Sequence, residues 1–147
     1  MTNSGPEYDQ FQYWMIDMTD AIDRFISTLP KPLASEMDFS SDSLAKLEAW
    51  LLSKYENVDQ TRPSSEAKTL DGAARYVGET FRRHLGGKWM IELDDPKDAF
   101  HGLPQLAEMK GQATPICPLT LVTTAISRRK GVTFSKVFGN HITRAAQ

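Results

Sequence analysis

The sequence predicts an α+β fold, in which a single helix-rich domain packs about five helices on a small antiparallel sheet. Apolar residues recur with the period of amphipathic helices in five separate stretches of the chain. A further stretch, "KWMIEL" at residues 88–93, alternates apolar and polar residues as a half-buried strand does. At 147 residues the chain has the length of one domain, which we expect over residues 7–147, after a flexible N-terminal segment at residues 1–6.

The first predicted helix covers residues 7–29. Its apolar residues keep the i, i+3, i+4, i+7 spacing of one continuous amphipathic helix, and three aspartates lie on the opposite face. Pro30 and Pro32 end it. Because the apolar stripe is wide and includes Trp14 and Phe25, a homodimer formed through this helix stays open beside a monomer.

The second predicted helix begins after Ser40 and runs to about Tyr55. The Ser40 hydroxyl is a typical N-cap, and Asp42 follows in the first turn, where the helix dipole favours an anion. The polar segment at residues 56–65 is expected to be a loop.

The third predicted helix covers residues 65–84 and leads into the strand at residues 88–93. Gly72 and Gly78 lie inside this helix, although glycine costs up to about 1 kcal/mol of helix propensity relative to alanine. We therefore expect another backbone to pack closely against it. The glycine pair that follows the helix supplies a left-handed C-cap.

The segment after the strand, residues 94–115, is expected to be mostly loop because prolines and glycines interrupt it. A short strand is predicted near residues 114–117. Pro118 then opens a fourth helix that ends at Gly131, and Thr133 is expected to cap a fifth.

Charge is distributed unevenly along the chain. The net charge is -2, yet residues 1–60 hold eleven acidic and four basic residues. Every charged residue after Glu108 is a lysine or an arginine. Two explanations stay open: an acidic face for a basic partner, or two ends that lie together and compensate each other. The basic end lacks the interleaved aromatic residues of nucleic-acid-binding surfaces, so no nucleic-acid partner is predicted.

Several classes of protein are disfavoured by the sequence. A single cysteine, Cys117, excludes an internal disulfide, and the histidines have no spacing typical of a metal site, so no metal or cofactor is predicted. The chain shows neither a signal peptide nor an apolar run of about 18 residues, which predicts a cytoplasmic protein without membrane contact.

Residues 74–93 hold the densest group of candidate catalytic side chains. Glu79 lies four residues from both Arg75 and Arg83, which predicts a solvated row of ion pairs. Two alternatives stay open: a buried Glu79 that ties the helix to a neighbouring backbone, and a general base acting with His84 or His101. No established catalytic motif occurs, so we expect no enzyme. A small-molecule pocket is a further alternative, lined by Glu79, Arg83, Trp89 and His101.

Three segments resemble a group of uncharacterised bacterial domains. These are "DFSSDSLAKLEAWL", the "YVGE" to "LGGKW" helix-to-strand signature, and "CPLTLV", together within residues 38–138. The resemblance implies a small cytoplasmic domain and transfers no catalytic residues. Small bacterial proteins of this size and build include immunity proteins, which neutralise a secreted toxin by binding it.

The sequence thus favours a non-enzymatic binding protein, by analogy an immunity-like or antitoxin-like inhibitor with a toxin domain as its partner. The partner would contact the acidic side of the chain, with an exposed aromatic residue, Trp50 or Tyr13, as the anchor. The acidic candidates are Asp17, Asp20, Asp23, Asp38 and Asp42.

Overall fold

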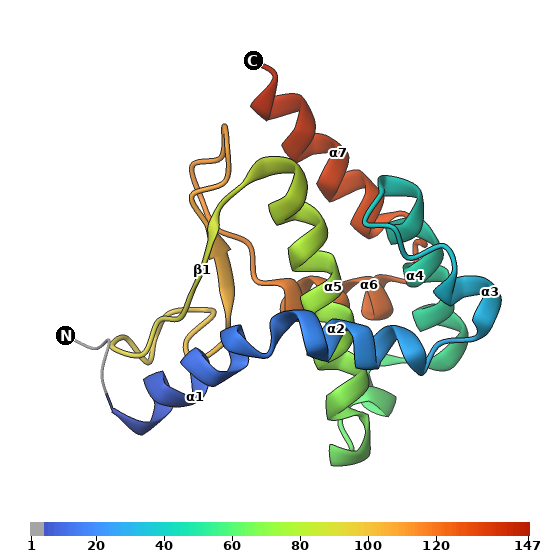
Figure 1. The fold of residues 1–147 in the computed structure, drawn as a ribbon, viewed down its shortest axis with the longest axis horizontal. Helices are drawn as coiled ribbons and strands as arrows, with labels where there is room; N and C mark the ends of the chain where they lie inside the picture. Colours follow the sequence, from blue (N-terminus) through green and yellow to red (C-terminus); the bar gives the residue numbers. More distant parts are fainter. Residues whose placement is uncertain (1–4) are drawn as a thin grey trace.

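A computed structural model describes residues 5–147 (Figure 1). The long helix α5 passes through the centre, and the other elements are arranged around it. The α+β class is confirmed, although residues 5–147 form seven helices instead of about five. The helices are α1 (Pro6–Ile16), α2 (Met18–Ser27), α3 (Lys31–Ala34), α4 (Ser41–Lys54), α5 (Ala67–Leu85), α6 (Pro118–Arg128) and α7 (Thr133–Ala145); the strands are β1 (Lys88–Met90) and β2 (Gln105–Ala107), and η1 (Val58–Thr61) and η2 (Ser64–Glu66) are short 3-10 turns.

The N-terminal helix is divided, so the prediction of one helix over residues 7–29 is wrong. Asp17, with ψ near 3°, separates α1 from α2. Both helices pack on α5, where Trp14 of α1 contacts Asp71 and Arg75 and also Trp89 of β1, whereas Phe25 of α2 lies against Gly72. The apolar stripe considered for a homodimer is therefore covered within the chain. Of the expected flexible segment, residues 1–4 lie outside the described part, and Pro6 already belongs to α1.

Helix α5 is the centre of the core, and its residues from Gly72 to Phe81 are all buried. A Cβ atom added at Gly72 would lie 2.4 Å from the Phe25 ring, and one at Gly78 would lie 2.1 Å from the Trp89 ring. The expected close approach therefore exists, but aromatic side chains make it, where a backbone neighbour was predicted. Flat rings fill the gaps that the missing side chains leave.

Helix α4 is joined to the C-terminal part of the chain by capping contacts. The predicted N-cap is confirmed, since Ser40 Oγ accepts a hydrogen bond from Ser43 N at 3.1 Å. The predicted Thr133 cap is wrong: the carboxylate of Glu48, fully buried on α4, accepts from the backbone N–H groups of Thr133 (3.1 Å) and Phe134 (2.7 Å). Glu48 thus satisfies the first donors of α7, where a negative charge is also favoured by the helix dipole.

The basic C-terminal region also contacts the other end of α4. The Arg129 guanidinium donates to the carbonyl oxygens of Leu52 and Tyr55, both at 2.8 Å. The acidic part of the chain, before residue 61, therefore contacts the basic part after Glu108 through α4, although α1 and the end of α7 lie apart (Figure 1). Hydrogen bonds make this contact. No ion pair within residues 5–147 links an acid before residue 61 to a base after Glu108.

The sheet is small and antiparallel, with Trp89 of β1 opposite Leu106 of β2. The predicted strand at residues 88–93 ends at Met90, and β2 lies in a segment expected to be loop. A three-residue strand is too short to show alternation in the sequence. The strand expected near residues 114–117 is a single bridge from Ile116 to Leu106.

The buried His141 predicts a pH dependence of stability. Burial, with the nearby Arg144 charge, lowers the pKa of His141 below its ordinary value of 6.5. As pH falls below 6.5, the unfolded chain therefore takes up a proton that the folded chain resists, and stability is lost. We expect urea titrations between pH 7.5 and 5 to show a flatter pH dependence for His141→Gln than for the wild type. Equal slopes would contradict the assignment.

Candidate functional site

Glu79 is a buried residue of α5 that holds the strand β1 against the helix. Its carboxylate accepts a hydrogen bond from Trp89 Nε1 at 2.8 Å and lies 3.6 Å from the Arg82 guanidinium. The expected solvated row of ion pairs is thus wrong at Glu79. The alternative that Glu79 ties the helix to a neighbour is nearer to the structure, although the neighbour is a side chain and not a backbone. A carboxylate used in this way is engaged in positioning Trp89.

The two arginines expected beside Glu79 have other contacts. Arg75 is buried and pairs with Asp71, four residues before it, at 2.7 Å. Arg83 lies over the ring of Phe39, 3.5 Å from its centroid. Either neighbour at i±4 is equally available to an arginine in sequence, so the choice of Asp71 depends on what packs around Arg75.

Trp14 of α1 packs against Arg75. Its ring lies 4.3 Å from the Arg75 guanidinium, its carbonyl oxygen accepts from Arg75 at 2.8 Å, and its Nε1 donates to Asp71 at 2.8 Å. Sequence reasoning missed this cluster of Trp14, Asp71 and Arg75. The only signal for it was the i, i+4 spacing of Asp71 and Arg75.

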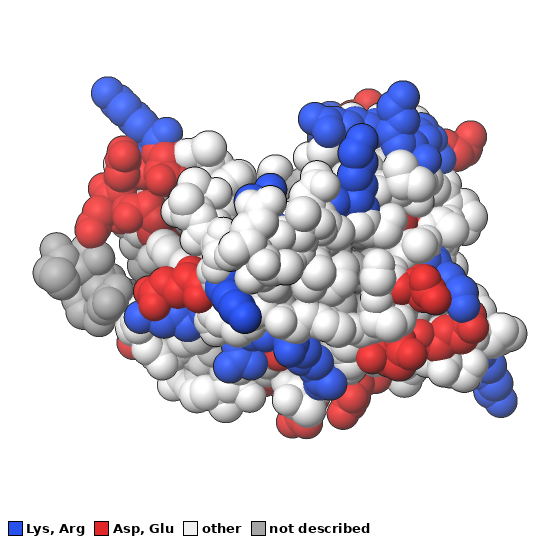
Figure 2. All heavy atoms as spheres, turned by 90° about the horizontal axis from the view of Figure 1, so that it is seen from above, with Lys and Arg blue, Asp and Glu red and all other residues white. Residues whose placement is uncertain are grey.

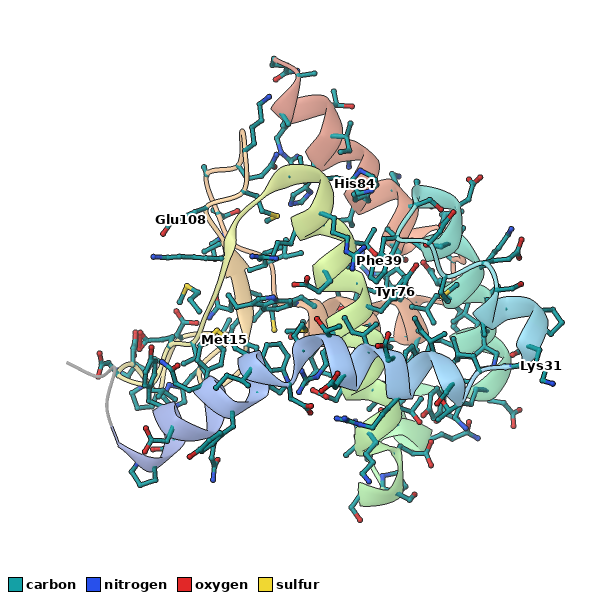
Figure 3. All side chains as sticks on the ribbon, viewed as in Figure 1. Met15, Lys31, Phe39, Tyr76, His84 and Glu108 are labelled. Carbon is teal, nitrogen blue, oxygen red and sulfur yellow. The ribbon has the colours of Figure 1, made fainter. Side chains whose placement is uncertain are left out.

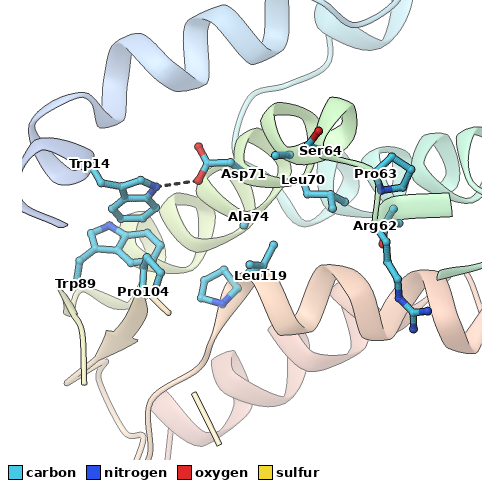
Figure 4. A pocket seen from close by; sticks show the side chains of 13 residues that line it. Trp14, Arg62, Pro63, Ser64, Leu70, Asp71, Ala74, Trp89, Pro104 and Leu119 are labelled. Atoms are coloured by element: carbon cyan, nitrogen blue, oxygen red, sulfur yellow. Dashed lines mark hydrogen bonds between the residues drawn. The ribbon is translucent and has the colours of Figure 1, made fainter. Parts of the chain in front are cut away.

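A pocket of about 240 Å³ opens beside this cluster, between α5 and α6 (Figure 4). Trp14 and Trp89, in edge-to-face contact at 4.9 Å, close one end, and the turns η1 and η2 close the other. The lining residues are Trp14, Thr61, Arg62, Pro63, Ser64, Ala67, Leu70, Asp71, Ala74, Trp89, Pro104, Pro118 and Leu119. Most of this surface is apolar and much of it is rigid proline or indole.

Of the residues predicted for a pocket, the structure brings together Glu79 and Trp89. Of Glu79, Arg83, Trp89 and His101, only Trp89 lines the pocket. Glu79 accepts the hydrogen bond of Trp89 Nε1 without lining the pocket, and Arg83 lies over the ring of Phe39. His101 is half-buried in the loop between the strands, where its Nδ1 has no hydrogen-bond partner among the described residues.

His84, the other predicted partner of Glu79, belongs to a different cluster. Its Nε2 lies 2.8 Å from the carbonyl oxygen of Phe39, whose ring stacks on Tyr76 (Figure 3). Tyr76 Oη accepts from Phe39 N at 2.8 Å. These contacts hold Phe39 at φ 62°, a conformation that a bulky side chain rarely adopts. The cluster fixes the turn before α4 and leaves His84 engaged away from Glu79.

The predicted partner-binding aspartates lie on a surface of mixed charge. Asp17 pairs with Arg24 at 2.6 Å, and this hydrogen bond lowers the pKa of Asp17. Asp38 accepts from Ser40, which lowers the pKa of Asp38. The remaining three candidates are exposed, Asp20 and Asp23 on α2 and Asp42 in the first turn of α4. In Figure 2, too, both signs occur on one face in several small clusters.

The two proposed aromatic anchors differ in exposure. Trp50 is half-buried, with its ring 6.3 Å from that of Phe25, so it does not project from the surface. Tyr13 on α1 is 71% exposed, and Ile16, one turn later, is 78% exposed. These are the two most exposed large apolar side chains of the described residues. Residues three apart lie on one helix face, so Tyr13 and Ile16 form one apolar pair in solvent.

Other candidate chemistry is limited within residues 5–147. Cys117 is buried and accepts a weak hydrogen bond from Thr120. No group of three or more histidine, cysteine or carboxylate side chains there is arranged to hold a metal ion. None of the described helices is long and apolar enough to cross a membrane.

Comparisons with family models, with curated proteins and with solved structures find no match to this chain. The resemblance to uncharacterised bacterial domains therefore stays a prediction.

Proposed function

We propose that this chain is a non-enzymatic, cytoplasmic binding protein that neutralises a bacterial toxin by protein–protein contact, as immunity proteins do. The observation that carries this proposal is the exposed apolar pair of Tyr13 and Ile16 on α1. Single exposed apolar side chains are common on proteins, but two large ones on one helix face, beside acidic residues, resemble the core of a binding site.

The charges around this pair fit a basic partner. Asp9 lies one turn before Tyr13, and Asp20 lies beyond the break at Asp17; both are exposed. In such an arrangement the aspartates speed encounter, whereas the apolar pair supplies most of the binding energy. The acidic set proposed from sequence contributes through Asp20 and Asp23, while Asp17 is already paired with Arg24.

The engagement of the buried ionisable groups also supports a binding role over catalysis. Glu48 caps α7, Glu79 holds Trp89, and Arg75 pairs with Asp71. A general base needs a carboxylate that is within reach of a substrate proton. Each of these groups is instead used to position neighbouring structure.

Isolation of the partner, followed by its co-expression with this chain, tests the proposed function. A tagged chain isolated from its own cells at low salt is expected to bring down one stoichiometric protein that arrests growth when it is produced alone. Production of the chain should restore growth. The double variant Tyr13→Ala/Ile16→Ala should weaken binding by about 2–4 kcal/mol and abolish the rescue, because it removes the anchors and not the fold.

Val132→Ala is the matched control, since Val132 is exposed at the start of α7, on a different element from the pair. It should bind and rescue as the wild type does. A partner that is harmless alone would rule out toxin neutralisation. Unchanged binding by the double variant would rule out the α1 face, the surface that Tyr13 and Ile16 form, as the binding site.

A further inference from the structure

The pocket between α5 and α6 has the dimensions of a small-molecule site. An apolar protein cavity of roughly 150 Å³ holds a benzene ring, whereas drug-sized ligands occupy about 300–1,000 Å³. At about 240 Å³ the pocket lies between these sizes and suits two fused rings. Its walls are preformed, because prolines at 63, 104 and 118 have few conformations and the Trp89 ring is held by Glu79.

The pocket wall includes a carboxylate that a ligand can contact. Asp71 lines the pocket with its side chain 45% exposed, and it accepts hydrogen bonds from Trp14 and Arg75. A carboxylate offers about four acceptor sites, so Asp71 retains capacity for a further donor. A ligand with an N–H or O–H group at its edge can fill that capacity while its rings contact the apolar wall.

The charges around the pocket balance. The buried Arg75 compensates Asp71, and Arg62, the one basic residue that lines the pocket, pairs with Asp59. In Figure 4 the Arg62 guanidinium is directed away from the tryptophan pair. An anionic ligand would therefore lose its hydration without gaining a cation inside the pocket.

From these three features we propose that the pocket binds a free, uncharged, flat molecule of two fused aromatic rings with one hydrogen-bond donor. This site is separate from the α1 face proposed for a protein partner, because Tyr13 and Ile16 do not line it.

Indole is the probe for the first test, because it has two fused rings and one N–H. In nuclear magnetic resonance spectra, indole should shift the side-chain N–H signals of Trp14 and Trp89 and leave that of Trp50 unchanged. Trp50 lines no part of the pocket and serves as an internal control. We expect a dissociation constant on the order of 0.1–1 mM for so small a ligand. Absent shifts, or equal shifts at all three tryptophans, would overturn the proposal.

Two related probes test the chemistry of the ligand. Indole-3-acetate carries a negative charge and should bind at least about tenfold more weakly than indole. N-acetyltryptophanamide represents an indole carried by a peptide, and its extra backbone should also weaken binding. Tighter binding of the acetate would overturn the neutral ligand, and tighter binding of the amide would replace a free ligand by a tryptophan of a partner protein.

A filled pocket tests the position of the site. Ala67 is exposed in the first turn of α5 and lines the pocket, so Ala67→Phe should place a ring there and weaken indole binding about tenfold or more. Ala49→Phe makes the same change at an exposed position of α4 outside the pocket, and it should bind indole as the wild type does. Tyr13→Ala/Ile16→Ala should also retain indole binding, which separates this site from the protein-binding face. Unaltered affinity in Ala67→Phe would overturn the location.

Discussion

Glu48→Ala is expected to lower the free energy of unfolding by about 3–5 kcal/mol, the largest loss for a single side chain that we expect. Glu48 is fully buried, and its two carboxylate oxygens accept from Thr133 N and Phe134 N. Alanine leaves both N–H groups without an acceptor in a buried place and opens a cavity between α4 and α7. Urea unfolding at pH 7 measures the loss.

Two further variants separate charge from general effects of substitution. Glu48→Gln keeps the shape and one acceptor oxygen, so it should cost less, about 1–3 kcal/mol. Glu36→Ala removes an exposed glutamate that pairs with Lys46 and should change stability by about 0.5 kcal/mol or less. A Glu48→Ala chain as stable as Glu36→Ala would show that the capping contact contributes nothing.

Gly78→Ala is expected to destabilise the chain by about 2–4 kcal/mol, although alanine favours helices. The new Cβ atom would lie 2.1 Å from the Trp89 ring and 3.0 Å from Pro118. Trp89 must then move, which disturbs its hydrogen bond to Glu79 and its contact with Trp14. Thermal and urea unfolding, together with the fluorescence of the tryptophans, should report both the loss and the displaced ring.

Gly139→Ala is the matched control because Gly139 lies within α7 and its added Cβ would meet nothing within 4 Å. The same substitution should there raise stability by up to about 1 kcal/mol through helix propensity alone. If both variants change stability alike, close packing at Gly78 has no energetic role.

The proposed site was predictable from sequence only in part. Of the four residues expected to line a pocket, Trp89 is the one that does. The other lining residues come from α1, α5, α6, the region of η1 and η2, and Pro104 before β2, far apart in sequence. Their contact depends on how α5 and α6 pack, and sequence spacing carries no record of that.

Local rules determined much of the fold. The sequence by itself determined the helix at Ser41–Lys54 through its Ser40 cap, the helix at Ala67–Leu85 through its apolar period, and the start of α6 through Pro118. These signals act within one or two turns, so neighbouring residues contain them.

Only the tertiary structure decided the partners of the buried charged groups. Arg75 pairs with Asp71 because Trp14 covers it, Glu79 accepts from an indole beside its ion pair with Arg82, and Glu48 caps a helix 85 residues away. A charged side chain has several partners within reach along a helix, and their energies in water are nearly equal. Burial removes the water that would otherwise solvate these charged groups. The arrangement that pairs every buried charge is then strongly preferred, because an unpaired buried charge is costly.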